Sequence, residues 1–206
     1  MKKIFLFLFL CAVPVSLFAA VGCDLNEPDR DVKRLFPAST GYKTRYLSLK
    51  TSGGQVLLER VEGRLGDKFK GLYETIDVPY TLYDIYKSKE IVGYIHGVNQ
   101  KGVYGGIQVF LALDAGGSIK SFYIQKLTSR AAKELRSKEF GKQFEGLGLK
   151  DFEPYDPAAG KAPEGSPAAG IRALTSKAGK DFNAVMRGVK KNLILMDEFV
   201  FSKKEK

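Results

Sequence analysis

"KGVYGGIQVFLALDAGGSIKSFYIQKLTSR", residues 101–130, has the most regular pattern of any segment in the sequence. It contains two runs, 106–113 and 118–126, in which β-branched and aromatic residues recur, as is typical of strands. Asp114 and the Ala-Gly-Gly that follows it lie between the runs, and glycine supplies the positive φ that a tight hairpin turn requires. The stretch therefore predicts two adjacent antiparallel strands joined by a short turn.

The sequence before this hairpin extends the sheet. "PYTLYDIYK" (79–87) and "EIVGYIHGV" (90–98) are rich in Tyr, Ile, Val and Thr and predict two further strands. "YKTRYLSLK" (42–50) alternates in the way that suits a strand. "GGQVLLERVEGRLG" (53–66) is ambiguous, although its apolar residues fit one face of a helix. The centre of the chain is thus expected to be an antiparallel sheet of at least four strands.

The sequence after the hairpin has a helical pattern. Leucine and phenylalanine recur near helical spacing in 129–147, and 156–170 is a Pro/Gly/Ala-rich loop with no expected core residues. A final apolar stripe predicts an amphipathic helix within 176–197, formed by Ala178, Phe182, Val185, Val189, Leu193 and Met196. Strands followed by helices indicate an α+β fold, a central antiparallel sheet with amphipathic helices packed on one face.

The N-terminal residues have the features of a secretory signal. Lys2 and Lys3 precede a short apolar run, 4–15, and small residues follow it. We therefore expect residues 1–22 to be a signal peptide, 23–41 to be a polar tether with a short helical turn, and 42–206 to form the folded domain.

Residues 19–23, "AAVGC", resemble the lipobox of bacterial lipoproteins, which predicts a lipid anchor on Cys23. Ordinary signal cleavage near Ala19 or Ala20 and an uncleaved N-terminal anchor are the alternatives. Cleavage of either kind takes the protein out of the cytoplasm, and we expect it at the periplasmic face of a bacterial membrane, anchored through lipid. Cys11 lies within the leader, so the mature chain has one thiol and no internal disulfide.

Charge and motif content exclude several classes of function. The formal net charge is +10, which in an exported protein suits anionic lipid headgroups or an anionic ligand, and makes nucleic acid a poor candidate. The single histidine, His96, lies in a predicted strand without a partnering Cys/His cluster, so we expect a hydrogen-bonded structural residue. No phosphate-binding loop or hydrolase motif occurs, and we assign no catalytic or metal-binding residue.

Residues 95–195 resemble the FMN-binding domain family, found in the G subunit of Rnf-type electron transport complexes and the C subunit of the sodium-pumping NADH:quinone reductase. The resemblance rests on three segments in the family's order: "GVYGGIQVFLALDAGGSIKSFYIQKLTS", "FGKQFEGL" and "IRALTSKAGKDFNAVMRGVKKNL". It implies an exported, membrane-associated protein that binds FMN and relays electrons among the subunits of a membrane redox complex.

One residue departs from the family pattern. Covalently flavinylated members carry FMN on a threonine of the closing motif, and that position here is Leu174, which has no hydroxyl. Thr175 is one residue out of register, about 100° further round a helix. We therefore expect FMN to be held non-covalently.

The expected FMN site combines the hairpin entry with the start of the last helix. A helix N-terminus with a hydroxyl cap and flanking cations favours a phosphate. The proposed cofactor-binding residues are Tyr104, Gly105, Gly106, Thr128, Ser129, Arg172, Thr175, Ser176 and Lys177. Two alternatives stay open because of Leu174: a binding or sensory lipoprotein that uses the fold without flavin, and a structural accessory subunit of a membrane complex.

Overall fold

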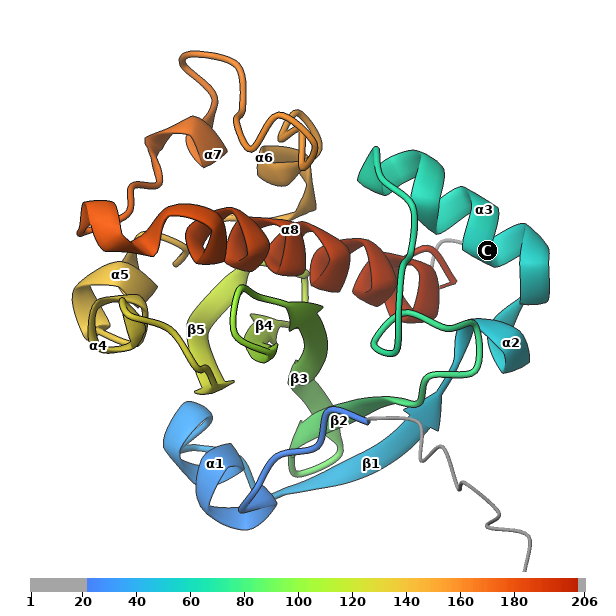
Figure 1. The fold of residues 1–206 in the computed structure, drawn as a ribbon. Coiled ribbons are helices and arrows are strands. Elements are labelled where there is room, and N and C mark those ends of the chain that lie inside the picture. Colours follow the sequence, from blue (N-terminus) through green and yellow to red (C-terminus); the bar gives the residue numbers. More distant parts are fainter. Residues whose placement is uncertain (1–21, 204–206) are drawn as a thin grey trace, which may run out of the picture.

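A computed structural model describes residues 22–203, so all of the predicted signal peptide except Gly22 lies outside the described residues. The strands form one antiparallel sheet in the order of the sequence (Figure 1). They are β1 (Gly41–Leu47), β2 (Tyr80–Lys87), β3 (Glu90–Lys101), β4 (Gly106–Asp114) and β5 (Ile119–Lys126). The predicted strands and the hairpin at 106–126 are confirmed.

The helices are mostly short. They are α1 (Pro28–Leu35), α2 (Leu49–Ser52), α3 (Gly54–Leu65), α4 (Ala132–Leu135), α5 (Lys138–Lys142), α6 (Leu149–Phe152), α7 (Pro167–Gly170) and α8 (Gly179–Met196). The ambiguous segment 53–66 is therefore a helix, and it buries Leu57, Val61 and Leu65 on one face. The α+β fold class is confirmed.

The long helix α8 packs across one face of the sheet, with α3 near its C-terminal end and α4 and α5 near its start (Figure 1). Alternate residues of the strands point into this layer, among them Leu82, Val98 and Val109, and they meet Val185, Val189 and Leu193 of the helix. The alternation along the strands and the apolar stripe at every third or fourth residue of α8 are the two patterns on which the sequence prediction rested.

The other face of the sheet is covered by the N-terminal segment, which differs from the expected tether. Leu25, Val32 and Phe36 are buried against the opposite side chains of the strands, such as Ile95 and Phe110. The predicted helical turn is α1. Three apolar residues spaced through a polar stretch suffice here, because a sheet that is apolar on both faces needs both of them covered.

Two further expectations need correction. The loop 156–170 does contribute to the core, because it includes α7 and its Ala168 is buried. The predicted helix 176–197 is divided: Ser176–Ala178 is a separate 3₁₀ turn, and Gly179, at a φ of 37°, changes the chain direction before α8 proceeds. A π-helical turn, Asp197–Phe201, then follows α8.

Candidate functional site at one end of the sheet

The tip of the β3–β4 hairpin lies against the first turn of α8. The backbone N–H of Val103 donates to Oδ1 of Asp181 at 2.8 Å, and Asp181 is buried. Gly105 has a φ of 138°, which favours glycine, and Tyr104 beside it is 52% exposed. A Cβ on Gly106 would lie 2.9 Å from the hydroxyl oxygen of Tyr73, so this glycine allows the close packing of two loops.

Thr128 and Ser129 lie at the same end of the sheet. Lys126, the last residue of β5, pairs with Gln108 near the start of β4, so the chain beyond it runs beside the hairpin entry. Thr128 is exposed, whereas the hydroxyl of Ser129 accepts a hydrogen bond from the N–H of Ala131 at 3.2 Å. Ser129 therefore also shapes the turn into α4.

Arg172 forms hydrogen bonds with Gln143, which directly follows α5, and with carbonyl groups of the loop that precedes it. Its N–H donates to Oε1 of Gln143 at 2.8 Å, and its carbonyl accepts from Nε2 of the same side chain at 3.1 Å. Its guanidinium donates to the carbonyl oxygens of Ala169 and, at 3.2 Å, Ile171. The side chain is exposed, so these partners compete with solvent.

The predicted cap is present but sits one element earlier. The hydroxyl of Thr175 accepts from the N–H of Lys177 at 3.3 Å and so caps the 3₁₀ turn. The cap position of α8 is Ala178, which gives no side-chain hydrogen bond. The N–H groups at the start of α8 therefore have no side-chain cap, while Ser176 and Lys177 are exposed beside them. Leu174, at the position of the family's threonine, is 49% exposed.

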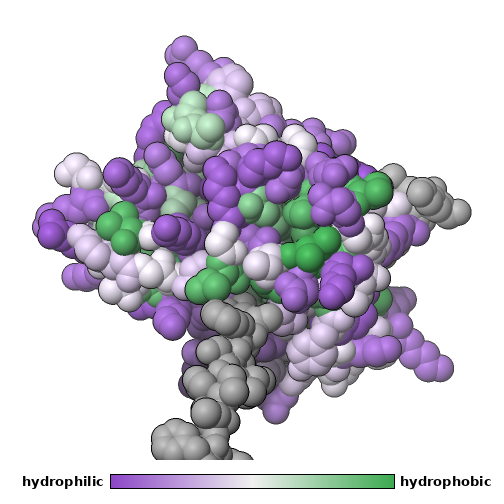
Figure 2. Space-filling view, turned by 45° about the vertical axis from the view of Figure 1, so that its right-hand side comes forward, coloured by the Kyte–Doolittle hydropathy of each residue, from purple (hydrophilic) through white to green (hydrophobic). Residues whose placement is uncertain are grey.

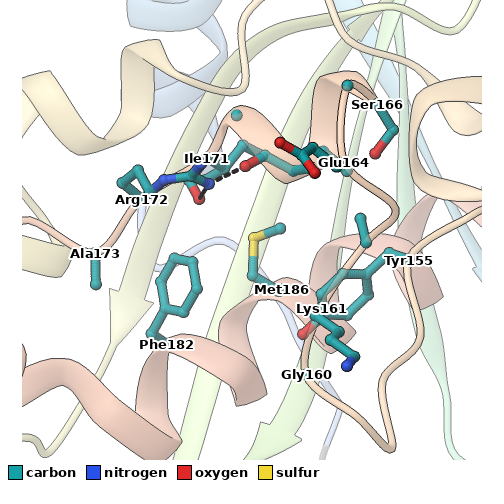
Figure 3. A pocket seen from close by; sticks show the side chains of 15 residues that line it. Tyr155, Gly160, Lys161, Glu164, Ser166, Ile171, Arg172, Ala173, Phe182 and Met186 are labelled. Atoms are coloured by element: carbon teal, nitrogen blue, oxygen red, sulfur yellow. Dashed lines mark hydrogen bonds between the residues drawn. The ribbon is translucent and has the colours of Figure 1, made fainter.

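A cavity of about 680 Å³ lies between the loop 156–173 and the start of α8 (Figure 3). Phe182 and Met186 project into it from α8, and Lys161, Glu164 and Arg172 lie around it. Its volume falls within the range of small-molecule sites. Among the predicted cofactor-binding residues, Arg172 lines this cavity, whereas the hairpin residues belong to the neighbouring surface.

The sequence pattern indicates other roles for the cavity residues. It places Phe182 in the apolar stripe of the last helix, and it assigns no role to Tyr155 or the loop beyond it. One feature of the sequence could have indicated the cavity: the Pro/Gly/Ala-rich loop 156–170 directly precedes the last of the three family-like segments, which begins at Ile171. Loops of this kind carry binding residues more often than the elements that they connect.

A buried charged cluster lies behind the hairpin, and no pattern in the sequence indicates it. Glu74 accepts hydrogen bonds from Arg187 at 2.6 Å and from Lys191 at 2.5 Å, and Arg187 also donates to Asp67 at 2.7 Å. Burial lowers the pKa of Lys191 to about 8, against the opposing effect of Glu74. Burial acts to raise the pKa of Glu74, but Lys191 and Arg187 hold it below the usual value. The cluster fixes the loop before β2 onto α8.

His96 is buried and hydrogen-bonded, as the sequence predicted. Its Nδ1 lies 2.8 Å from Oδ1 of Asn192, whose amide nitrogen donates to the His96 carbonyl at 2.9 Å. Because that amide nitrogen is the donor, Oδ1 is the acceptor and the neutral ring carries its proton on Nδ1. Burial lowers the pKa of His96 to about 4. No group of three or more His, Cys, Asp and Glu within residues 22–203 could hold a metal ion.

Cys23, the predicted lipidation site, is 2% exposed. Its sulfur lies 2.8 Å from the place that a Cβ on Gly97 would occupy, and burial raises the pKa of the thiol. The adjoining backbone is tied to the sheet, since the N–H of Leu25 donates to the hydroxyl of Tyr83 at 3.1 Å. A lipid on Cys23 requires this residue to leave its position on the sheet.

Comparisons with known proteins support the fold. No family model matches the sequence, and no curated protein matches it. The chain is an α+β protein with the same fold as NqrC. The crystal structure of NqrC from Shewanella oneidensis is similar with a TM-score of 0.55 at 14% identity, over 86% of this chain and 88% of that one. None of the described helices is both long and apolar enough to span a bilayer.

Proposed function

We propose that the protein is an exported, membrane-associated flavoprotein that binds FMN non-covalently and relays electrons within a membrane redox complex. The observation that carries the proposal is the fold shared with NqrC over 86% of the chain. The order of the three family-like segments in the sequence supports it independently. The proposal gives the chain a role in electron transfer, with no catalytic residue of its own.

The residues at this end of the sheet fit FMN without a covalent bond. The cavity of about 680 Å³ has an aromatic and apolar side formed by Phe182 and Met186, which suits a flavin ring. Arg172 and Lys177, together with the uncapped N–H groups of α8, suit its phosphate. Leu174 supplies no hydroxyl, so a phosphoester at this position does not fit.

Bound FMN would supply the redox chemistry, since no side chain in this site does so. The chain would bind and orient it. We propose that Phe182 would border the ring from the side of α8, and that Tyr104 and Thr128, which lie outside the cavity lining, would border it from the hairpin side. Glycine at position 105, beside which a Cβ would meet nothing within 4 Å, would leave backbone groups accessible to the polar edge of the ring.

Membrane association belongs to the same proposal and rests on the leader sequence. A lipid on Cys23 would anchor the chain at about 0.8 kcal/mol per buried CH₂. We expect Cys23→Ser to move the protein from the membrane fraction to the soluble fraction. An unchanged distribution would indicate an uncleaved leader as the anchor instead, and soluble wild-type protein would indicate ordinary cleavage.

The FMN site is tested by titrating purified protein with FMN and following the quenching of flavin fluorescence. A charge-assisted contact contributes about 1.5–3 kcal/mol, so Arg172→Ala should weaken binding roughly ten- to a hundredfold. Arg136→Ala is the matched control, because its side chain donates to the Gln125 carbonyl on the neighbouring strand β5. Equal effects of the two variants would contradict the proposed position of the phosphate.

A second function is favoured by Leu174 and by the contacts of Arg172. Both are compatible with an accessory or binding lipoprotein that retains the fold without flavin. In that case the titration shows no saturable FMN binding at millimolar concentration.

A further inference from the structure

Several segments meet at the end of the molecule that carries the hairpin tip. We call residues 101–106, 126–145 and 172–180 the basic end. Gln143 holds Arg172 through two hydrogen bonds, and the rings of Phe140 and Phe182 lie 6.1 Å apart. Figure 1 shows α4, α5 and the start of α8 together at the left of the molecule. The segments therefore form one continuous region, although they are distant in sequence.

The basic end carries the excess positive charge of the described chain. It contains ten Lys and Arg residues against three Asp and Glu, whereas the rest of residues 22–203 holds nineteen of each. All ten cations are exposed, and none of them forms an ion pair with another described residue. They are Lys101, Lys126, Arg130, Lys133, Arg136, Lys138, Lys142, Arg172, Lys177 and Lys180. Unpaired cations concentrated on one side create a field that attracts an anionic surface.

Apolar side chains protrude among these cations. Val103 is 51% exposed at the hairpin tip, next to the half-exposed Tyr104, and Leu174 is similarly exposed before α8. Elsewhere on the surface, on the face in Figure 2 that brings the side of α3 forward, hydrophobic side chains form small, separate areas among hydrophilic ones. Single apolar residues surrounded by lysine suit the interfacial layer of a bilayer better than a dry protein interface, and tyrosine is enriched in that layer.

The chain enters the fold near the basic end. The carbonyl of Gly22, the first described residue, accepts a hydrogen bond from the side chain of Asn99 at 3.1 Å. Asn99 lies two residues before Lys101 on β3. The N–H of Asn26 donates to Gln125, the neighbour of Lys126, at 3.0 Å. Gly22 and Asn26 therefore lie at the end of the sheet that carries Lys101 and Lys126.

We propose that the basic end docks on an anionic phospholipid surface, with Val103 and Tyr104 at the level of the headgroups. The excess positive charge supplies the attraction, and each Lys or Arg near the surface increases the affinity about fivefold. A lipid on Cys23, next to Gly22, would hold the same end toward the bilayer. The inference shares the membrane location and several residues, among them Tyr104, Arg172 and Lys177, with the proposed function, but it requires no flavin.

The orientation is tested with a tryptophan reporter, because the chain contains no tryptophan. Tyr104→Trp, combined with Cys23→Ser so that no acyl chain anchors the protein, should show a blue-shifted emission and quenching by brominated lipid on phosphatidylglycerol vesicles, and no change on phosphatidylcholine vesicles. Val56→Trp is the control: Val56 is 68% exposed and lies on α3, which is near the C-terminal end of α8, away from the basic end (Figure 1). Unchanged emission from the Tyr104→Trp variant on both kinds of vesicle, or equal signals from the two variants, would overturn the proposal.

The contribution of charge is tested by paired reversals outside the proposed FMN site. In the same unacylated Cys23→Ser background, Lys133→Glu with Lys138→Glu should reduce the vesicle affinity at least about tenfold, and 0.5 M salt should abolish the binding of the Cys23→Ser parent. Lys87→Glu with Lys89→Glu makes the same charge change at the β2–β3 turn, the opposite end of β3, and should have a much smaller effect. Equal losses from the two pairs would show that net charge, and not this surface, governs binding. FMN titration of the same Lys133/Lys138 variants separates the two proposals. Retained FMN binding together with lost vesicle binding would show that membrane docking does not depend on the flavin site.

Discussion

The backbone and guanidinium N–H groups of Arg172 form hydrogen bonds with other groups of the protein. Its guanidinium donates to the carbonyl oxygens of Ala169 and Ile171, which are uncharged acceptors. A phosphate would form charge-assisted bonds with the same donors, and these are about twice as strong. The residue is therefore able to exchange its present partners for an anion at little cost. Leu174, two positions later, removes the covalent alternative.

His96 makes the stability of the fold depend on pH. Its folded-state pKa of about 4 is below the value of about 6.5 in an unfolded chain, so the unfolded state takes up the proton first as the pH falls. The associated stability is complete above pH 6.5 and decreases by up to roughly 3 kcal/mol as the pH falls to about 4. Urea unfolding across this range should show the decrease.

A His96→Gln variant is the control for that measurement, because glutamine does not titrate. Its unfolding free energy should depend less steeply on pH between 6.5 and 4 than that of the parent. Parallel curves for the two proteins would show that other groups cause the decrease.

The burial of His96 in a strand could be predicted from its sequence neighbours, but its partner could not. Asn192 lies 96 positions further along the chain, in the middle of α8. Pairs that depend on the packing of a helix on a sheet leave no local pattern. For the same reason the sequence placed Arg172 and Lys177 near a candidate anion site, but missed Phe182 as a cavity residue.

The elements are joined by a few strong contacts, and the Glu74 cluster contains the most buried ion pairs among the described residues. Removing Glu74 leaves Lys191 and part of Arg187 without compensation for their charge in a buried position. Breaking a buried pair in this way typically costs about 3–5 kcal/mol. We expect Glu74→Ala to lower the free energy of unfolding by that amount, measured by urea denaturation.

Glu145→Ala provides the comparison. Because Glu145 is exposed, this substitution should change the free energy of unfolding by less than about 0.5 kcal/mol. If Glu74→Ala behaves in the same way, the buried cluster does not fix the loop to α8.

The regular elements were predictable because their periodicity reflects burial. The strands between 79 and 126 and the stripe of α8 follow directly from it. Periodicity did not predict the break at Gly179, because the break depends on a single glycine. It did not predict the packing of α1 either, because that packing depends on three apolar residues within a polar segment. The helices α4 to α7 are too short to show a reliable period.

The whole molecule combines a sheet covered on both faces with a single region of unbalanced charge. The sequence showed the net charge but not its position, because the cations of the basic end come from three separate segments. The cavity beside α8 and the hairpin tip lie in or next to this region. The proposed FMN site would therefore face the same side as the proposed membrane contact, a suitable arrangement for a subunit that exchanges electrons with a membrane complex.

The central claim is that the chain holds FMN without a covalent bond. The most direct measurement is the absorption spectrum of protein purified from flavin-replete bacteria, followed by acid precipitation. The account predicts a yellow protein whose flavin passes entirely into the supernatant as FMN. A colourless protein that also fails to take up added FMN would contradict it, as would flavin that remains in the precipitate.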